Sequence, residues 1–384
     1  MKNFFLDNKI NFVFLVISFV CLVVVLGFEN ISLQNTKWLH KGEPAFHQTG
    51  WYFFSSDIWR FPIGSNPNFG YGISNSIVFS DSIPILALIF KLLKPILPEN
   101  IQYFSIWYFL CFYFQLFFSF QILKKFTESI SFSFIGSIFF LLAPIFIYRI
   151  NLHSALCGQW ILLFTLYLGL THKVDKKLFT WIFIIVLSSL IHFYFTVMIF
   201  SVYSILRLFN FFSEKENLLN PLKDFLTIAF ALSLTLYIVG YFEIRMADSL
   251  GVGFGYHKMN LLSIFDPVNS VHNISWSWLL PDIKLSTGEE LEGFNYLGLG
   301  QITMFLFAFL LFAYRKVTTN SLLIKNIKEI KIFIFISVLF TFWALSNKIS
   351  FGSVLLLEIP LNKLFFGVLS IAKSSARMFW LVNY

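Results

Sequence analysis

Charged residues are scarce in this sequence. Asp, Glu, Lys and Arg make up 12% of its 384 residues, whereas soluble domains carry roughly 25%. Apolar residues make up 57% of the chain. Several apolar runs reach the roughly 17–25 residues that cross a hydrocarbon core of about 30 Å. The composition therefore argues against a soluble domain and predicts an all-α polytopic membrane protein.

Cysteine is also rare, with three residues in the whole chain. Cys21 and Cys111 lie inside apolar runs, where we expect them to pack, and Cys157 lies near a polar junction. The sequence has no C-x-x-C pair and no Cys/His spacing typical of a metal site. It therefore gives no support for a disulfide framework or for zinc.

The first apolar run lacks the small-residue cleavage site of a secretory signal peptide. It covers Ile10–Phe28 and ends in Gly27-Phe28-Glu29-Asn30, with Lys2 and Lys9 before it. This length and ending predict an uncleaved signal anchor rather than a cleaved signal.

Further apolar runs predict further membrane spans. With the first, they lie at about 10–28, 101–123, 130–148, 156–171, 178–191, 194–210, 225–242, 296–314 and 332–346, and one more begins near Met378. The segment Ile83–Leu97 is apolar but contains two lysines and two prolines, so we predict an interfacial helix. The polar junction at His192 favours a hairpin of two spans over one long tilted helix.

Basic residues are distributed unevenly about these spans. With the N-terminus inside, the cytoplasmic segments hold 15 Lys and Arg against 7 Asp and Glu, and the remaining 13 and 13 lie outside. Cytoplasmic loops of membrane proteins are enriched in Lys and Arg. The net charge of +8 is therefore a topology signal, and no nucleic-acid partner is expected. The external segments are 29–100, 149–155, the junction at 192, 243–295 and 347–377.

The first external loop, residues 29–100, holds two carboxylates close to the membrane. Glu43 follows the first span, and Asp81 directly precedes the predicted interfacial helix. Either could take a proton from an acceptor hydroxyl or hold a divalent cation, Mg²⁺ or Mn²⁺, against phosphates. Carboxylates alone do not decide whether a metal cofactor is needed. Alternatively, each could cap a helix N-terminus.

Cations at external span ends are candidates for binding an anion. Arg149 and His153 follow the third span, and Lys373 and Arg377 precede the last. An arginine can hold phosphate oxygens in bidentate fashion. The alternative for Arg149 is an interfacial side chain that reaches the lipid headgroups.

Other loop features are less specific. The glycines at 251, 253 and 255 alternate but do not form a dinucleotide-binding fingerprint, so we expect tight turns there. Tryptophans in the external loops could stack on sugar rings or anchor the chain at the membrane interface.

Seven segments spread over nearly the whole chain carry a resemblance to a known family. They are GEPAFHQTGWYFF, RFPIGSNPNFGYG, SIVFSDSIPILAL, RINLHSALCGQW, GFGYHKMNLLSIFDP, EGFNYLGLG and SSARMFW. Together they resemble an uncharacterised family of bacterial multi-span proteins that is related, at the level of fold, to glycosyltransferases of the C superfamily (GT-C). Such enzymes transfer a sugar from a polyprenyl-phosphate carrier with inversion at the anomeric carbon.

The resemblance implies a GT-C-like transmembrane core with large extracytoplasmic loops and a role for several candidate residues. Glu43 would be the catalytic base, with Asp81 assisting it or binding a cation. Arg149, His153 and Arg377 would hold the donor phosphate, and Lys373 is a further candidate because it lies beside Arg377 at the same external boundary. The resemblance would place Tyr256, His257 and Glu292 near the sugar or acceptor. Apart from the resemblance, His47, Trp51, His192, Tyr194 and Tyr296 are further candidates for binding the sugar or acceptor.

The chain departs from the GT-C pattern in two respects. Glu43 stands where an aspartate is frequent, and the first loop lacks the paired acidic signature of several branches. Related proteins continue with further spans after the SARMFW-like segment, so we expect this chain to be truncated at its C-terminus.

These observations predict a bacterial inner-membrane glycosyltransferase with a cytoplasmic N-terminus and an extracytoplasmic active face. Its partners would be a polyprenyl-phosphate-linked sugar, membrane lipid and a cell-envelope glycan or lipid acceptor. A transporter or lipid flippase is one alternative, although transporters usually carry internal repeats and charges at mid-bilayer. A non-catalytic assembly protein is another.

Overall fold

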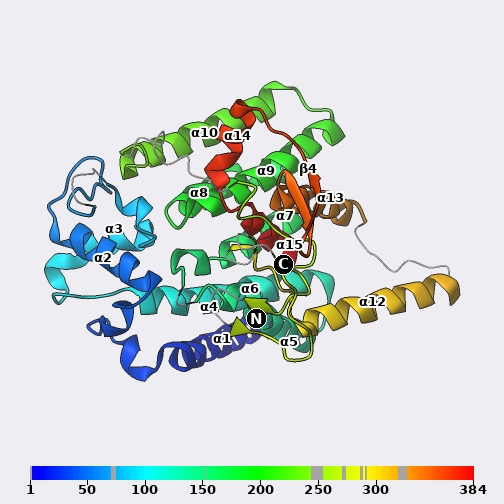
Figure 1. Ribbon diagram of the computed structural model, residues 1–384, viewed down its shortest axis with the longest axis horizontal. Coiled ribbons are helices and arrows are strands. Elements are labelled where there is room, and N and C mark those ends of the chain that lie inside the picture. The colour runs from blue at the N-terminus through cyan, green and yellow to red at the C-terminus, as the bar shows by residue number, and fades with distance from the viewer. Residues whose placement is uncertain are drawn as a thin grey trace. The chain divides into compact units, whose positions relative to one another are not determined.

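The protein is mostly helical, as its composition predicts (Figure 1). The computed structural model describes residues 2–70, 75–150, 152–243, 254–269, 274–285, 289, 292–318 and 327–384. The glycines at 251 and 253 lie outside these ranges. Strands in the described ranges form two short antiparallel hairpins. Contacts divide the chain into two compact units, residues 1–142 with 146–245, and residues 143–145 with 246–384.

Four helices of the first unit are long and apolar enough to cross a membrane, counting only the described residues. They are α1 (Lys2–Leu26), α4 (Phe104–Phe126), α9 (Phe193–Glu214) and α10 (Leu219–Val239). On α10, large apolar side chains face outward, with Phe230 70% and Leu226 61% exposed. Exposed apolar faces of this extent are characteristic of surfaces that contact lipid or a partner. Length and composition thus support the prediction of a membrane protein.

Three other apolar helices of the first unit, α5 (Ile130–Leu141), α7 (Trp160–Thr171) and α8 (Leu178–Ser189), are shorter than the spans predicted there. The span predicted at 130–148 is divided into α5 (Ile130–Leu141) and the single turn α6 (Pro144–Ile147). Pro144 explains the break, because proline has no N–H to donate and the residue before it disfavours helical geometry. The hairpin predicted around His192 is present as α8 (Leu178–Ser189) followed by α9.

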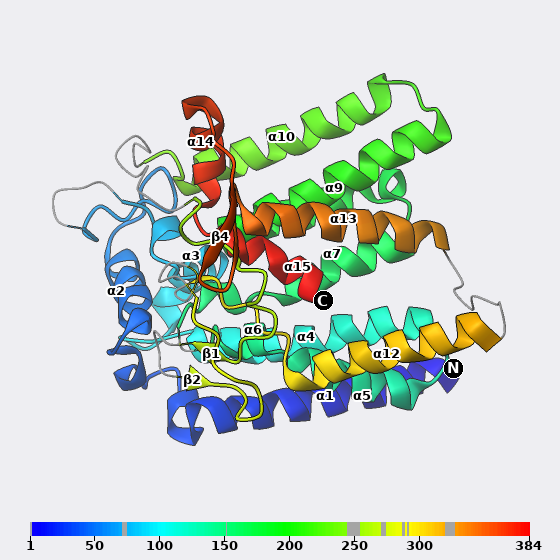
Figure 2. The ribbon, with the colours of Figure 1, turned by 45° about the vertical axis from the view of Figure 1, so that its right-hand side comes forward.

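Helix α4 forms the centre of the first unit. It packs against α1, α5 and α7 (Trp160–Thr171), and α9 packs against both α7 and α8 (Figure 2). Apolar residues surround α4 on all sides, so it can be buried by several neighbours at once. Lys124 and Lys125 occupy its last turn, where cations interact favourably with the helix dipole.

The first loop folds into two helices, α2 (Glu43–Ser56) and α3 (Pro84–Leu93), which pack against each other. Helix α2 begins after Gly42, whose φ of 62° favours glycine, and has a proline in its first turn. Helix α3 stands where the sequence predicted an interfacial helix. These two helices carry much of the candidate site.

The second unit combines helices and hairpins. Helices α12 (Leu299–Thr318) and α13 (Ile327–Leu345) are followed by strands β3 (Lys348–Phe351) and β4 (Val354–Glu358), then by α14 (Lys363–Leu369) and α15 (Trp380–Asn383). Strands β1 (Val268–Asn269) and β2 (Ile274–Ser275) form the other hairpin. Helix α13 packs against the chain segment 375–383, which contains the SARMFW motif.

Candidate functional site

Five polar side chains from four separate segments of the first unit meet in one place, which we call the histidine–carboxylate cluster. Glu43 and His47 come from α2, Asp81 from the turn before α3, His153 from the segment after α6, and His192 from the junction of α8 and α9. The Nδ1 atom of His153 lies 3.5 Å from Glu43 Oε2 and 3.6 Å from Asp81 Oδ2. The Nε2 atom of His192 lies 3.3 Å from Asp81 Oδ1.

The helical spacing of α2 brings two members of the cluster together. Glu43 and His47 are four residues apart, so they project from the same helix face one turn apart. The Glu43 side chain is 51% exposed, whereas His47 is completely buried. One face of α2 therefore presents a carboxylate that solvent or a ligand can reach beside an imidazole fixed in the protein interior.

Asp81 is held in position by an unusual turn. The backbone of Asp81 (φ 50°) and of Ile83 (φ 49°) is left-handed. Aspartate tolerates this conformation, but for a β-branched residue such as Ile83 it is strained. The hydroxyl of Ser82 donates to the carbonyl of His47 at 2.7 Å, and the hydroxyls of Ser80 and Ser82 are 2.8 Å apart. These bonds join the turn to α2.

Gly50 allows this turn to approach α2 closely. A Cβ atom at position 50 would lie 2.5 Å from Ser80 Cβ and 2.9 Å from Ser82 Oγ, closer than real Cβ contacts. On the other side, the hydroxyl of Tyr103 donates to the carbonyl of Ser82. The turn that carries Asp81 is thus enclosed between α2 and the start of α4.

His47 is anchored through one of its ring nitrogens. Its Nδ1 lies 3.2 Å from the hydroxyl of Ser154, which in turn lies 2.9 Å from the hydroxyl of Tyr108. Its Nε2 is buried and has no hydrogen-bond partner among the described residues. Burial lowers the pKa of His47 to about 4, since the nearby Asp81 only partly offsets it and the other two histidines lower it further. His47 is therefore neutral at pH 7.

His192 and Asp81 form an oriented pair. The Nδ1 atom of His192 accepts the backbone N–H of Tyr194 at 3.2 Å, which caps α9. In a neutral imidazole the other nitrogen then carries the proton, so Nε2 can donate to Asp81. Burial by itself raises the pKa of Asp81, but the charge of His192 and hydrogen bonds from His153 and His192 hold it well below its usual value. Asp81 is therefore ionised at neutral pH.

The structure separates the two alternatives proposed for the carboxylates. Ile83 is the N-cap residue of α3, and no side chain caps that helix, so Asp81 is not a helix cap. Glu43 does lie in the first turn of α2, where a carboxylate interacts favourably with the helix dipole. That position is compatible with its membership of the cluster.

Arg149 is buried, with 2% of its surface exposed. Its guanidinium carbon lies 5.0 Å from the ring centre of Tyr148, and its carbonyl accepts the backbone N–H of His153 at 3.1 Å. A side chain that reached the headgroups would be exposed. Arg149 is therefore an interior residue of the first unit rather than a side chain that extends to the headgroups. It lies one turn before His153.

Trp51 does not have the exposed ring expected of a sugar-stacking residue. Only 2% of it is exposed, and its Nε1 donates to the carbonyl of Ile101 at 2.8 Å. Its large apolar ring is more stable in the core between α2 and the start of α4 than in water. Tyr194 lies beside His192, with ring centres 5.4 Å apart.

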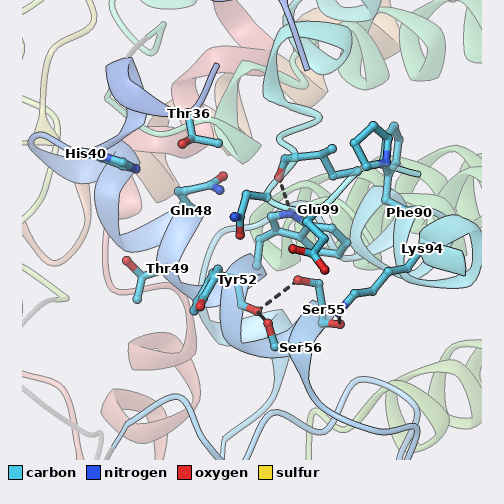
Figure 3. A pocket seen from close by; sticks show the side chains of 14 residues that line it. Thr36, His40, Gln48, Thr49, Tyr52, Ser55, Ser56, Phe90, Lys94 and Glu99 are labelled. Atoms are coloured by element: carbon cyan, nitrogen blue, oxygen red, sulfur yellow. Dashed lines mark hydrogen bonds between the residues drawn. The ribbon is translucent and has the colours of Figure 1, made fainter. Parts of the chain in front are cut away.

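A cavity of about 650 Å³ with a mixed polar and apolar lining opens next to α2 (Figure 3). Gln48, Thr49, Tyr52 and Ser55 line it from α2, and Lys94 and Glu99 line it from the segment after α3. The Oε1 atom of Gln48 is buried without a hydrogen-bond partner in the described part of the chain. This cavity adjoins a different face of α2 from the one that bears Glu43 and His47.

The remaining predicted residues belong to the second unit. The guanidinium of Arg377 lies 3.0 Å from Glu292 Oε1 and donates to its Oε2 at 3.2 Å. The two residues that were expected to hold phosphate and sugar therefore bond to each other. Tyr296 is 1% exposed, and Tyr256 is 45% exposed.

Three further observations concern His257, Lys258 and Lys373 in the second unit. The carbonyl of His257 accepts the backbone N–H of Ala376 at 3.2 Å. A buried pair that the sequence did not predict, Lys258 with Glu289, is joined by Asn260. The side chain of Lys373 has no role that these contacts define, so its phosphate role stays a prediction.

The helical fold and the cluster identify the chain as a candidate membrane protein, with a polar site where its first loop meets His153 and His192. The chain belongs to the family described as "Domain of unknown function (DUF6311)", whose model matches residues 15–384. No curated protein and no solved structure matches the chain.

The sequence analysis identified each of the five cluster residues as a candidate. It did not predict that their side chains lie together. His47 was assigned to the sugar or acceptor and His153 to the phosphate, whereas the structure brings both to Glu43 and Asp81. One local signal was available, because Glu43-x-x-x-His47 places two potential metal ligands on one helix face. The serines around Asp81 gave no comparable signal.

Proposed function

We propose that this protein is a membrane glycosyltransferase of GT-C type, which moves a sugar from a polyprenyl-phosphate donor to a cell-envelope acceptor. The observation that supports the proposal best is the convergence of two carboxylates, Glu43 and Asp81, on His153 in a loop between membrane-length helices. A lipid-linked donor requires a reactive site beside the bilayer, and an acceptor hydroxyl requires a base.

In the proposed reaction an acceptor hydroxyl attacks the anomeric carbon of the donor sugar. The new O–C bond forms as the bond from that carbon to the lipid phosphate breaks, with inversion. Glu43 takes the hydroxyl proton, and its half-exposed side chain can be reached by an acceptor. Asp81 is ionised, which leaves it able to assist as a second base or to bind a cation.

The leaving phosphate gains negative charge during transfer and needs a cationic environment. His153 lies between the two carboxylates, and Arg149 is one turn before it on the same segment. These two residues are the first-unit candidates for contact with the phosphate. For Lys373 and Arg377, which belong to the second unit, the phosphate role stays a prediction from the sequence.

The cavity on the other face of α2 offers space for a part of the acceptor remote from the hydroxyl that reacts at Glu43. Its volume of about 650 Å³ lies in the range of small-molecule pockets, roughly 300–1,000 Å³. Figure 3 shows Gln48, Thr49, Tyr52 and Glu99 around it, which supply both hydrogen-bond donors and acceptors. Such a lining suits the hydroxyl groups of a carbohydrate better than an apolar chain.

Transfer can be measured with purified full-length protein and radiolabelled polyprenyl-phosphate sugars. We expect Glu43→Gln to abolish transfer and Asp81→Asn to reduce it strongly. Glu128→Gln is the matched control, because Glu128 is exposed and lies outside the cluster. Full activity of the Glu43→Gln variant would remove Glu43 as the base. Lipid movement across proteoliposomes without donor turnover would instead support a flippase.

A further inference from the structure

The cluster offers metal ligands at the separation that one ion requires. Ligand atoms of Glu43, His47 and His153 all lie within 4.8 Å of one another. His153 Nδ1 is 3.5 Å from Glu43 Oε2 and 3.6 Å from Asp81 Oδ2. Two ligands of a tetrahedral ion with bonds of about 2.1 Å lie about 3.4 Å apart. The two separations measured from His153 are therefore close to those of atoms that share one ion.

The surroundings of His47 give a second, independent indication. Its ring is fully buried, yet Nε2 has no hydrogen-bond partner among the described residues. A buried polar atom without a protein partner costs free energy unless a water or an ion satisfies it. Because Nδ1 contacts the hydroxyl of Ser154, Nε2 is the nitrogen left for an ion.

The residues that contact the proposed ligands are of the kind that orient the ligands in known metal sites. A histidine that binds metal usually donates its other N–H to an oxygen atom, which fixes the ring. Ser154 provides that oxygen for His47, and Tyr108 in turn contacts Ser154. His192 can donate to Asp81 in the same supporting role, while its own Nδ1 is occupied by the Tyr194 amide.

We propose that Glu43, His47 and His153 bind one first-row transition-metal ion, with the neighbouring Asp81, which contacts His153, as a fourth ligand and Zn²⁺ as the preferred species. Mg²⁺ prefers six oxygen ligands and keeps several waters, whereas two imidazoles with two carboxylates suit zinc. The ligands come from three segments that are distant in sequence. The search for a local Cys/His spacing therefore could not find this site. Glu43 is half exposed, so the ion is reachable from solvent. The proposal rests on the cluster alone and does not require the transferase reaction.

The test measures bound metal rather than activity. Full-length protein in detergent is stripped with a chelator, loaded with Zn²⁺, Mn²⁺ or Mg²⁺ separately, desalted and analysed by mass spectrometry for metal per chain. We expect about one Zn²⁺ per chain, and no displacement by Mg²⁺ in about a hundredfold excess. His47→Ala, His153→Ala and the half-exposed Glu43→Gln should each weaken Zn²⁺ binding at least tenfold. His172→Ala is the control, because His172 is exposed and outside the cluster.

His192→Ala separates a supporting role from a ligand role. It should weaken Zn²⁺ binding roughly 10–100-fold without changing the stoichiometry at saturation. Size-exclusion profiles show which variants remain folded. If the variants of the buried histidines do not fold, the result is decided by Glu43→Gln, which changes a half-exposed side chain. Absence of Zn²⁺ from the wild type, or unchanged binding by Glu43→Gln and His47→Ala, overturns the site. Zinc binding without sugar transfer would defeat the transferase proposal alone, and sugar transfer by a wild-type protein that takes up no Zn²⁺ would defeat the metal proposal alone.

Discussion

At the scale of single residues, burial and neighbours give identical side chains different chemistry. His47 is neutral because it is fully buried, whereas His192 is oriented by a backbone amide and serves Asp81. Lys91 on α3 is a comparable case away from the cluster. It is 5% exposed, and its ammonium lies 3.9 Å from the ring centre of Phe54 and 4.8 Å from that of Trp59. Burial lowers the pKa of Lys91 to about 8.

The lowered pKa of Lys91 predicts that the stability of the protein changes with pH in the alkaline range. The unfolded chain has an ordinary lysine pKa of about 10.4, so it binds more protons than the folded protein between about pH 8 and pH 10. The free energy of unfolding that Lys91 contributes should therefore increase as pH rises through this window. Lys91→Met keeps the length of the side chain and removes its charge. Thermal unfolding is measured at pH 7.5 and at pH 9.5. Between these two pH values the stability of Lys91→Met should increase less than that of the wild type. Equal increases would contradict the lowered pKa of Lys91.

At the scale of elements, close packing of α2 against the 80–83 turn positions Asp81. Gly50→Ala would add a Cβ atom 2.5 Å from Ser80 Cβ, so the turn or the helix must move. We expect a loss of about 1–3 kcal/mol in the free energy of unfolding, together with reduced sugar transfer and zinc binding. Gly367→Ala in α14 is the matched control, because no atom lies within 4 Å of the added Cβ. Wild-type properties of Gly50→Ala would show that the turn does not depend on this contact.

A buried arginine joins α9 to the start of α10. Arg207 is 1% exposed and bonds to Glu216 at 2.8 and 3.0 Å and to Asp224 at 2.7 Å. Arg207→Met leaves two carboxylates without their cation. Breaking a buried pair costs roughly 3–5 kcal/mol, and we expect about 1–3 kcal/mol because both carboxylates remain partly exposed.

Denaturant unfolding of Arg207→Met should be compared with that of Lys173→Met. Lys173 pairs with Glu214 on the surface, so its loss should change stability little. Hydrogen bonds from Arg207 lower the pKa of Glu216, so this part of the stability is present above the ordinary glutamate pKa of about 4.3 and is lost as pH falls below it. Equal stabilities of the two variants at pH 7 would contradict the importance of the Arg207 network.

At the scale of the whole molecule, the distribution of charge predicts which side of the membrane carries the site. From the surplus of Lys and Arg in the loops that follow α4, α7 and α9, we expect these loops in the cytoplasm and the first loop outside. Single cysteines can test this in a variant without Cys21, Cys111 and Cys157. A membrane-impermeant maleimide added to intact cells should label Gln34→Cys and spare Glu128→Cys. The reverse labelling would refute the predicted orientation, and with it an external active site.

Much of the architecture follows from local sequence. Runs such as Leu219–Val239 can satisfy every backbone group only as helices in an apolar setting, so their existence and type were predictable. Pro144 was visible, yet the predicted span 130–148 ran across it, because a proline can either kink or end an apolar helix. Helix ends such as Gly240, whose φ is 94°, depend on single residues and were accordingly predicted only approximately.

The sequence by itself determined the apolar helices and the polar character of the first loop, because both depend on which residues are near each other along the chain. Only the tertiary structure decided that Glu43, His47, Asp81, His153 and His192 share one site and that Trp51 belongs to the core. Those facts depend on close contacts between segments far apart in sequence, such as Gly50 against Ser80 and His47 against Ser154. Contacts of that kind are set by packing, which no local pattern of residues specifies.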